Sequence, residues 1–126
     1  MFTYTLDNKR YHTFNYFLKN KFNNKVFKVA LDANFSCPNK NTGGCIFCAD
    51  GSKSNITDNK KSILDQYEEV KNIMLKKWPD SLYIPYLQAN TNTYDKLNNL
   101  KKVYEPLLKL DNTVGLAIAT RPDCIT

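Results

Sequence analysis

The alternation of apolar and polar stretches along the chain predicts three buried strands separated by helices and polar loops. Nearly continuous apolar runs cover residues 26–31, 81–87 and 114–119, and such runs are typical of parallel strands, which are buried on both faces. Apolar residues at three-to-four spacing predict helices over 62–78 and 94–107. Two strand–helix–strand crossovers place the strands in one parallel sheet. We therefore predict an α/β fold.

Capping residues and prolines predict where these elements end. Ser62 can cap the first crossover helix, with Asp65 three residues later, and Pro79 ends it. Pro85 offers no amide hydrogen to the second strand, so we expect the pairing there to be locally broken. A short amphipathic helix is predicted over 13–22, before the first strand.

Three cysteines lie in the loop after the first predicted strand. Cys37, Cys45 and Cys48 are spaced Cys-x7-Cys-x2-Cys, and Gly43 and Gly44 allow the backbone to turn tightly between them. A Cys-x2-Cys pair brings two sulfurs round one metal centre. Structural zinc sites have four protein ligands, so a set of three leaves one coordination position open. Parallel α/β sheets place ligand sites at the carboxyl ends of their strands, where this loop begins.

Four further segments carry a resemblance to a known family. They are Asp32 to Asn39, Gly43 to Cys45, Gln88 to Tyr94 and Thr120 to Cys124. With the cysteine loop, they resemble the radical S-adenosylmethionine (radical SAM) superfamily, and within it a poorly characterised branch similar to the radical domain of the Elongator catalytic subunit. The commonest loop of the superfamily is Cys-x3-Cys-x2-Cys. The branch uses a longer first gap, and the seven residues of this chain are fewer than that branch leads us to expect.

The resemblance implies a radical enzyme that binds a [4Fe-4S] cluster and S-adenosyl-L-methionine. Cys37, Cys45 and Cys48 would hold three irons, and the amino and carboxylate groups of S-adenosylmethionine would chelate the fourth. Reduction by an electron donor would cleave the carbon–sulfur bond of this small-molecule cofactor. The resulting 5′-deoxyadenosyl radical would remove a hydrogen atom from a substrate that the sequence does not identify. The cofactor supplies this chemistry, and the protein supplies position and exclusion of water; no catalytic residue is assigned.

Polar residues after the second predicted strand are candidates for the methionine end of the cofactor. By resemblance, Gln88, Asn90 and Asn92 lie where radical enzymes commonly bind the amino group of S-adenosylmethionine. Amide oxygens suit an ammonium because they accept hydrogen bonds. Asn92 and Thr93 are equally suited to cap the helix that follows.

Phe47 and Arg121 complete the candidate cofactor site. Phe47 matches the aromatic residue that lies near the adenine in many members of the superfamily, and a place in the core explains it equally well. Arg121 follows the third predicted strand. Its planar guanidinium either clamps a carboxylate or phosphate of a ligand or pairs with Asp123.

A zinc-binding module is an alternative function, and a non-catalytic fragment is another. For zinc, Cys124 or His12 would supply the fourth ligand. Colour separates the metals, because a [4Fe-4S] protein is brown and a zinc protein is colourless. Two disulfides are disfavoured, since three of the four cysteines share one loop and no secretory signal precedes them.

The formal net charge of +6 is concentrated near the beginning of the chain, where residues 9–28 contain six lysines and arginines. Such a basic arm is able to meet a polyanion, and the resemblance to Elongator makes RNA a candidate partner. However, no RNA-binding motif is present, and a lysine- and asparagine-rich composition throughout favours a solvated surface. No apolar run approaches the ~20 residues of a membrane span. We therefore predict a cytoplasmic protein without a membrane partner.

The expected domain organisation follows from the resemblance. Residues 1–25 form an N-terminal helical arm, and residues 26–126 form the N-terminal half of a radical SAM core domain. That core is a parallel-sheet partial (βα) barrel, of which only the first three strand–helix units are expected here, with the rest of the barrel missing. We expect the third strand to lack its outer neighbour, and the fragment to carry the cluster ligands but to be inactive or weakly active alone.

Overall fold

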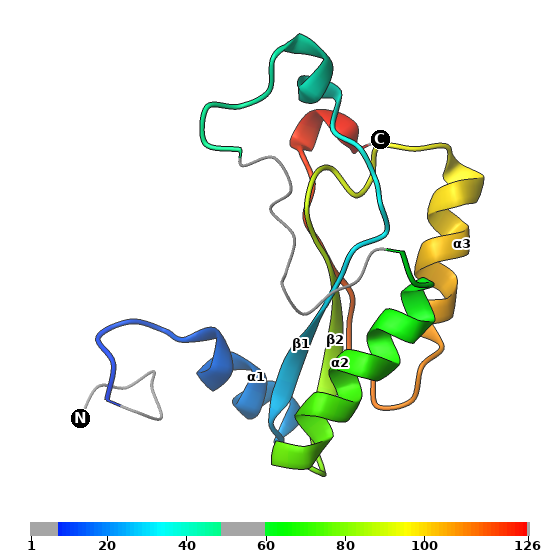
Figure 1. Ribbon diagram of the computed structural model, residues 1–126. Helices are drawn as coiled ribbons and strands as arrows, with labels where there is room; N and C mark the ends of the chain where they lie inside the picture. Colours follow the sequence, from blue (N-terminus) through cyan, green and yellow to red (C-terminus); the bar gives the residue numbers. More distant parts are fainter. Residues whose placement is uncertain (1–7, 49–59, 126) are drawn as a thin grey trace.

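The computed structural model describes residues 8–48 and 60–125, which form a three-stranded parallel sheet with helices on both faces (Figure 1). The elements in chain order are α1 (Phe14–Phe22), β1 (Val26–Leu31), α2 (Ile63–Lys77), β2 (Leu82–Leu87), α3 (Leu97–Leu108) and β3 (Ala117–Ile118). Short 3-10 turns lie over Pro38–Thr42 and Pro122–Cys124. The sheet order is β1-β2-β3 and both pairs are parallel. The predicted α/β fold with a parallel sheet is confirmed; residues 1–7 of the predicted arm lie outside the described part.

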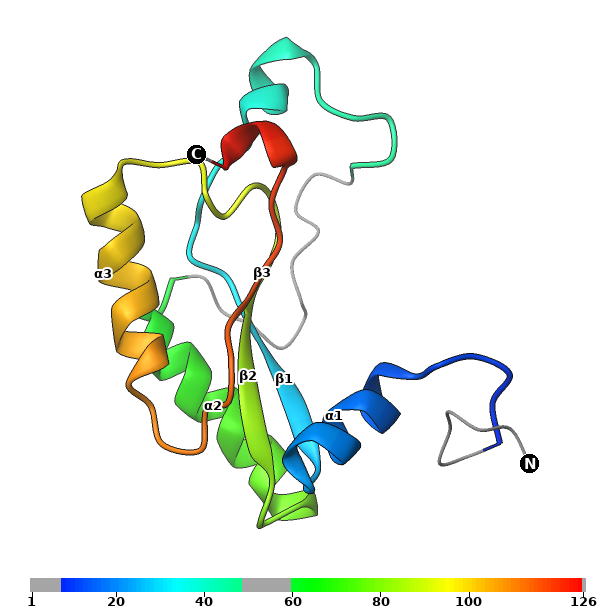
Figure 2. The same ribbon diagram turned by 180° about the vertical axis from the view of Figure 1, so that it is seen from behind.

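Each face of the sheet has its own apolar cluster, because successive side chains of a strand point to opposite faces. The larger cluster consists of Val29, Leu31, Tyr67, Val70, Tyr83, Leu87 and Leu107. It lies between the sheet and the helices α2 and α3, which cover the front face in Figure 1. The smaller cluster consists of Leu18, Val26 and Ile84. It holds α1 on the opposite face, near the end of the sheet where the strands begin (Figure 2).

Pro85 lies in the central strand and disturbs pairing on one side only. Toward β1 the register is unbroken over all six residues of β2. Toward the third strand, Tyr83 pairs with Thr113 and the next pair is Tyr86 with Ala117. Three steps along β2 therefore correspond to four along its neighbour, which is the geometry of a bulge.

The missing amide hydrogen of Pro85 explains this interruption. The amide of Tyr83 donates to the carbonyl of Asn112 at 2.8 Å. Residue 85 lies two positions later, so its amide would face the same neighbouring strand. Proline has no amide hydrogen to donate there. The predicted break in pairing at Pro85 is thus confirmed. The predicted extent of the third strand, 114–119, is wrong, because regular pairing leaves only Ala117–Ile118 as β3.

The helix α2 begins at its predicted cap. The Ser62 hydroxyl accepts a hydrogen bond from the amide of Asp65 at 3.2 Å, and α2 ends two residues before Pro79. The Thr13 hydroxyl caps α1 in the same way, accepting from the amide of Tyr16 at 3.1 Å. Among residues 8–48 and 60–125, no helix combines the length and apolar character needed to cross a membrane.

The helix α3 begins later than predicted. Its first residue is Leu97 and its N-cap is Lys96, which makes no side-chain capping bond. The alternative role of Asn92 and Thr93 as caps of this helix is therefore wrong. Pro106 lies inside the last turn of α3, which ends two residues later.

A buried amide on α2 holds the chain where it leaves β1. Gln66 is 2% exposed. Its oxygen accepts from the amide of Asp32 at 2.9 Å, and its nitrogen donates to the carbonyl of Asp32 at 2.9 Å and to that of Lys61 at 3.1 Å. Both backbone groups of Asp32 are satisfied by this one side chain, so Gln66 determines where the cysteine loop begins.

Replacing Gln66 with alanine should lower the free energy of unfolding by about 2–4 kcal/mol, because it leaves buried backbone groups of Asp32 unpaired and opens a cavity. Urea unfolding at an unchanged m-value measures the effect. The control is Asn72→Ala, an exposed position on the same helix, which should change stability by no more than about 0.5 kcal/mol. An equal response of the two variants would contradict the clamping role of Gln66.

Candidate functional site

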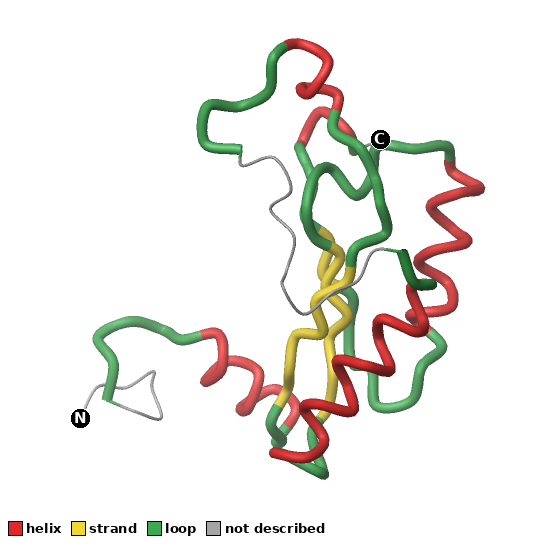
Figure 3. Tube along the Cα trace, in the orientation of Figure 1, coloured by secondary structure: helices red, strands yellow, loops and turns green. Residues whose placement is uncertain are grey.

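The carboxyl ends of the three strands meet at one edge of the sheet, and their loops lie together there (Figure 3). Backbone hydrogen bonds join the loops. The amide of Thr91 donates to the carbonyl of Ser36 at 3.2 Å, and the amide of Asn92 donates to that of Ala119 at 3.0 Å. Segments from three distant parts of the chain therefore form one candidate site at the edge where parallel α/β sheets bind ligands.

Cys37 lies at the centre of these contacts and is half-buried. A hydrogen bond with the side chain of Thr91 is the main cause that lowers the pKa of the Cys37 thiol; burial opposes it, and the Asn39 amide and Arg121 guanidinium lower the pKa further. A lowered pKa favours the thiolate, which is the form that binds metal ions. The predicted metal ligand thus has surroundings that suit the role.

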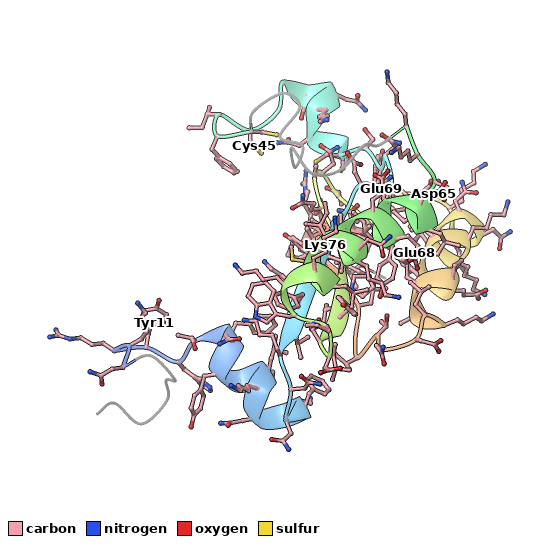
Figure 4. All side chains as sticks on the ribbon, turned by 60° about the horizontal axis from the view of Figure 1, so that its bottom comes forward. Tyr11, Cys45, Asp65, Glu68, Glu69 and Lys76 are labelled. Carbon is pink, nitrogen blue, oxygen red and sulfur yellow. The ribbon has the colours of Figure 1, made fainter. Side chains whose placement is uncertain are left out.

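Cys45 and Cys48 lie in one turn that extends away from the sheet (Figure 4). The amide of Cys48 donates to the carbonyl of Cys45 at 3.0 Å, and the side-chain nitrogen of Asn39 lies 3.0 Å from the Cys45 sulfur. Gly43 and Gly44 have φ angles of 99° and 75°, so the tight turn predicted there is present and needs glycine.

The structure does not gather the three thiols round one point. Cys45 and Cys48 are exposed, and within residues 8–48 and 60–125 no three histidine, cysteine, aspartate or glutamate side chains are close enough to hold a metal ion. The donor set nonetheless fits an iron–sulfur cluster, because it comprises three thiols, of which two share a Cys-x2-Cys turn. The glycine pair at 43–44 separates that turn from Cys37.

Phe47 lies between these two cysteines and is 87% exposed. The alternative that placed it in the core is therefore wrong. An exposed aromatic residue at the tip of a loop is available to contact a ligand, and Ile46 beside it is also exposed.

The polar residues after β2 have distinct surroundings. Asn90 donates from its side chain to the carbonyl of Phe35 at 3.0 Å. Asn92 is 0% exposed, so it offers no surface to a ligand, whereas Gln88 is half-buried. Thr91 is the residue of this segment that interacts with Cys37. Sequence reasoning marked this segment as polar but did not single out Thr91, because no local pattern shows which residue meets the cysteine loop.

Arg121 pairs with Asp123, which is one of the two alternatives that the sequence predicted. Its Nε lies 3.0 Å from one carboxylate oxygen, and a terminal nitrogen lies 2.8 Å from the other. Hydrogen bonding to Asp123, and then to Cys37, raises the pKa of Arg121. The guanidinium is therefore held in place by a two-point contact beside the Cys37 thiol.

The two candidates for a fourth metal ligand differ in position. Burial, followed by the charge of Asp123, raises the pKa of Cys124, and a smaller contribution comes from Cys37. His12 contacts the rings of Tyr16 and Phe17 at centroid distances of 5.4 Å and 6.3 Å. His12 therefore lies beside α1, and α1 lies near the end of the sheet opposite the cysteine loop (Figure 1).

A hollow of about 800 Å³ lies between the start of α3 and the end of the described chain. It is lined by Thr93, Tyr94, Asp95, Lys96, Leu97, Leu100, Asp123, Cys124 and Ile125. This volume is in the range of small-molecule sites, and the lining combines both charges with apolar side chains. The sequence alone did not indicate it, since its walls come from separate segments.

The chain is similar to three longer proteins. It is 45% identical over 129 residues to the uncharacterized protein YtqA of Bacillus subtilis. This match covers 98% of this chain and 40% of YtqA. Over 112 residues it is 35% identical to the uncharacterized protein MJ0486 of Methanocaldococcus jannaschii and 33% identical to protein YhcC of Escherichia coli. These matches cover 86% of this chain and 34% and 35% of the two proteins. No family model matches, and no solved structure matches.

Replacing Ala89 with glycine should stabilise the protein by about 1 kcal/mol, because Ala89 has φ 36°, a left-handed conformation in which a Cβ atom is disfavoured. Thermal or urea unfolding measures the change. The matched control is Ala30→Gly in β1, which should destabilise by about 1 kcal/mol, since glycine weakens a regular strand. Destabilisation by both substitutions would refute the left-handed assignment.

Proposed function

We propose that this chain is part of a radical enzyme in which Cys37, Cys45 and Cys48 bind a [4Fe-4S] cluster with one iron left open for S-adenosylmethionine. The observation that carries the proposal is the loop with three thiols after the carboxyl end of β1, whose beginning at Ser36 is hydrogen-bonded to the polar segment after β2. On this proposal the three parallel strands are the first units of a partial barrel of the radical SAM type. The whole protein's substrate and activity stay open, because the chain spans less than half of its relatives.

The surroundings of the thiols support this assignment. Thr91 and Arg121 favour the thiolate of Cys37, and the turn over residues 45–48 keeps the other two cysteines together. When bound, the cluster would supply the electron that cleaves S-adenosylmethionine, after reduction by an external one-electron donor. The protein's own residues would hold the cofactor and exclude water, with Phe47 and Gln88 available for contact. Free thiols of this kind persist in a reducing compartment, so we place the protein in the cytoplasm.

Anaerobic reconstitution with iron and sulfide should give about one [4Fe-4S] cluster per chain, with the brown absorption of such clusters. Alanine at Cys37, Cys45 or Cys48 should reduce bound iron to background, because three protein thiolates are needed to retain it. The matched control is Cys124→Ala, which should keep the cluster. Loss of iron in the control, together with retention in any of the other three variants, would overturn the ligand assignment.

Adding S-adenosylmethionine should change the electron paramagnetic resonance spectrum of the reduced cluster, because its amino and carboxylate groups would bind the open iron. 5′-Methylthioadenosine lacks both groups and should leave the spectrum unchanged. An identical spectrum with and without S-adenosylmethionine, on an intact and reduced cluster, would count against cofactor binding.

A zinc site is the second candidate, and the position of Cys124 at the same edge of the sheet favours it, since the Cys124 carbonyl accepts a hydrogen bond from Thr93 after β2. Cys124 would then complete a closed set of four thiolates. In that case the protein purified without oxygen would be colourless and hold about one zinc per chain. The variant Cys124→Ala separates the two functions, because it removes a zinc ligand but no cluster ligand.

A further inference from the structure

Asn92 is a fully buried amide at the junction of β2 and the segment after β3. Its side-chain nitrogen donates to the carbonyls of Leu87 at 3.3 Å, Ala89 at 2.9 Å and Ala119 at 2.9 Å. All three partners are acceptors, so the NH₂ group is the end of the amide that faces them. One side chain thus joins the end of β2, the turn after it and the segment that follows β3.

The backbone of Asn92 is held from two further sides. Its amide donates to the carbonyl of Ala119 at 3.0 Å, so this carbonyl accepts twice from one residue. Its own carbonyl accepts a hydrogen bond from the hydroxyl of Tyr104 on α3. The position of Asn92 is therefore determined by β2, α3 and the end of β3 together.

The side-chain oxygen of Asn92 has no partner among the described residues. A buried acceptor without a partner opposes folding, and an apolar side chain of similar volume would avoid that cost. Such a side chain would, however, leave the carbonyls of Leu87, Ala89 and Ala119 without this donor. What the amide provides, and an apolar side chain would not, is two N–H donors shared among three carbonyls, which hold the path of the turn.

The residue before Asn92 contacts the cysteine loop. Thr91 is 1% exposed, and its amide donates to the carbonyl of Ser36 at 3.2 Å. Ser36 directly precedes Cys37, and the side chain of Thr91 is the main cause that lowers the pKa of the Cys37 thiol. A shift of the turn at Asn92 would move the Thr91 hydroxyl away from that thiol.

The residue after Asn92, Thr93, contacts the segment that follows β3. The Thr93 hydroxyl lies 2.5 Å from that of Thr120 and 2.7 Å from the carbonyl of Cys124. The amide of Tyr94 donates to the carbonyl of Thr91 at 3.1 Å and closes the turn round Asn92. The two threonines that reach the cysteine-bearing segments are thus held by the buried residue between them.

We propose that Asn92 is the positioning residue of the candidate site: its buried amide fixes the turn over 91–94, so that Thr91 meets Cys37 and Thr93 meets the segment of Cys124. Asn92 acts through its neighbours and does not itself contact a ligand. Only the link from Asn92 to a cluster at Cys37 rests on the proposed function. The holding of the turn is a property of the chain without any cofactor.

Amide hydrogen exchange on the full chain without a cluster tests the positioning role. Asn92→Leu should accelerate exchange of the Thr91 and Tyr94 amides about tenfold relative to the amide of Gln88, which donates to Leu31 at 3.0 Å in the same edge. The control is Leu107→Ala, a core position on α3 that is 0% exposed. Leu107→Ala should accelerate exchange by the same factor at every amide that exchanges through global unfolding, so that Thr91 and Tyr94 are not accelerated more than Gln88.

A spectroscopic readout then tests the link to Cys37. After reconstitution, Asn92→Leu should shift the electron paramagnetic resonance spectrum or the reduction midpoint of the cluster, and Leu107→Ala should shift neither. Failure of the unmodified chain to bind iron would refute the proposed function alone, because the exchange comparison would still decide whether Asn92 holds the turn.

Tyr104→Phe is the milder variant if Asn92→Leu does not fold. It removes only the hydroxyl bond to the Asn92 carbonyl, and it should accelerate exchange at Thr91 about threefold relative to Gln88. The proposal would be overturned if whichever of Asn92→Leu and Tyr104→Phe folds accelerated exchange equally at Thr91 and Gln88, which is the pattern expected of Leu107→Ala. A selective rise at Thr91 without any change in the cluster spectrum would overturn its link to Cys37.

Discussion

The parallel pairing of β1 with β2 is the constraint on which the rest of the structure depends. It runs without a break through all six residues of both strands. At its end, the amide of Gln88 donates to the carbonyl of Leu31 at 3.0 Å and continues the ladder into the loops. Because parallel strands end at the same edge, the cysteine loop and the polar segment after β2 leave the sheet side by side. The third strand joins the same edge even though Pro85 interrupts its pairing.

Beyond the strands, the backbone needs hydrogen-bond partners that the sheet no longer provides. Two buried amides supply them at different points of the edge. Gln66 satisfies both backbone groups of Asp32, where the chain leaves β1. Asn92 satisfies carbonyls at the ends of β2 and β3. A neutral amide can donate and accept in a buried place without the desolvation cost of a charge, so irregular loops are held firmly beside the candidate site.

Charge at this edge distinguishes two nearby thiols. Hydrogen bonds from Thr91 and then Asn39 and Arg121 lower the pKa of Cys37 despite its burial. Burial and the carboxylate of Asp123 raise the pKa of Cys124. The same carboxylate holds Arg121 in a two-point contact, and the positive charge of Arg121 only partly offsets the effect of Asp123 on Cys124. This difference suits Cys37 better than Cys124 for binding a metal as the thiolate.

The sequence by itself determined the features that depend on neighbouring residues. The strand β1, the cap at Ser62 and the break opposite Pro85 follow from local periodicity and from which backbone groups a residue offers. Tertiary structure alone decided that Asn92 turns inward while Thr91 meets Cys37. It also decided that α3 begins only at Leu97. These outcomes depend on where the carbonyls of distant segments lie, and those positions exist only once the three strand ends have met.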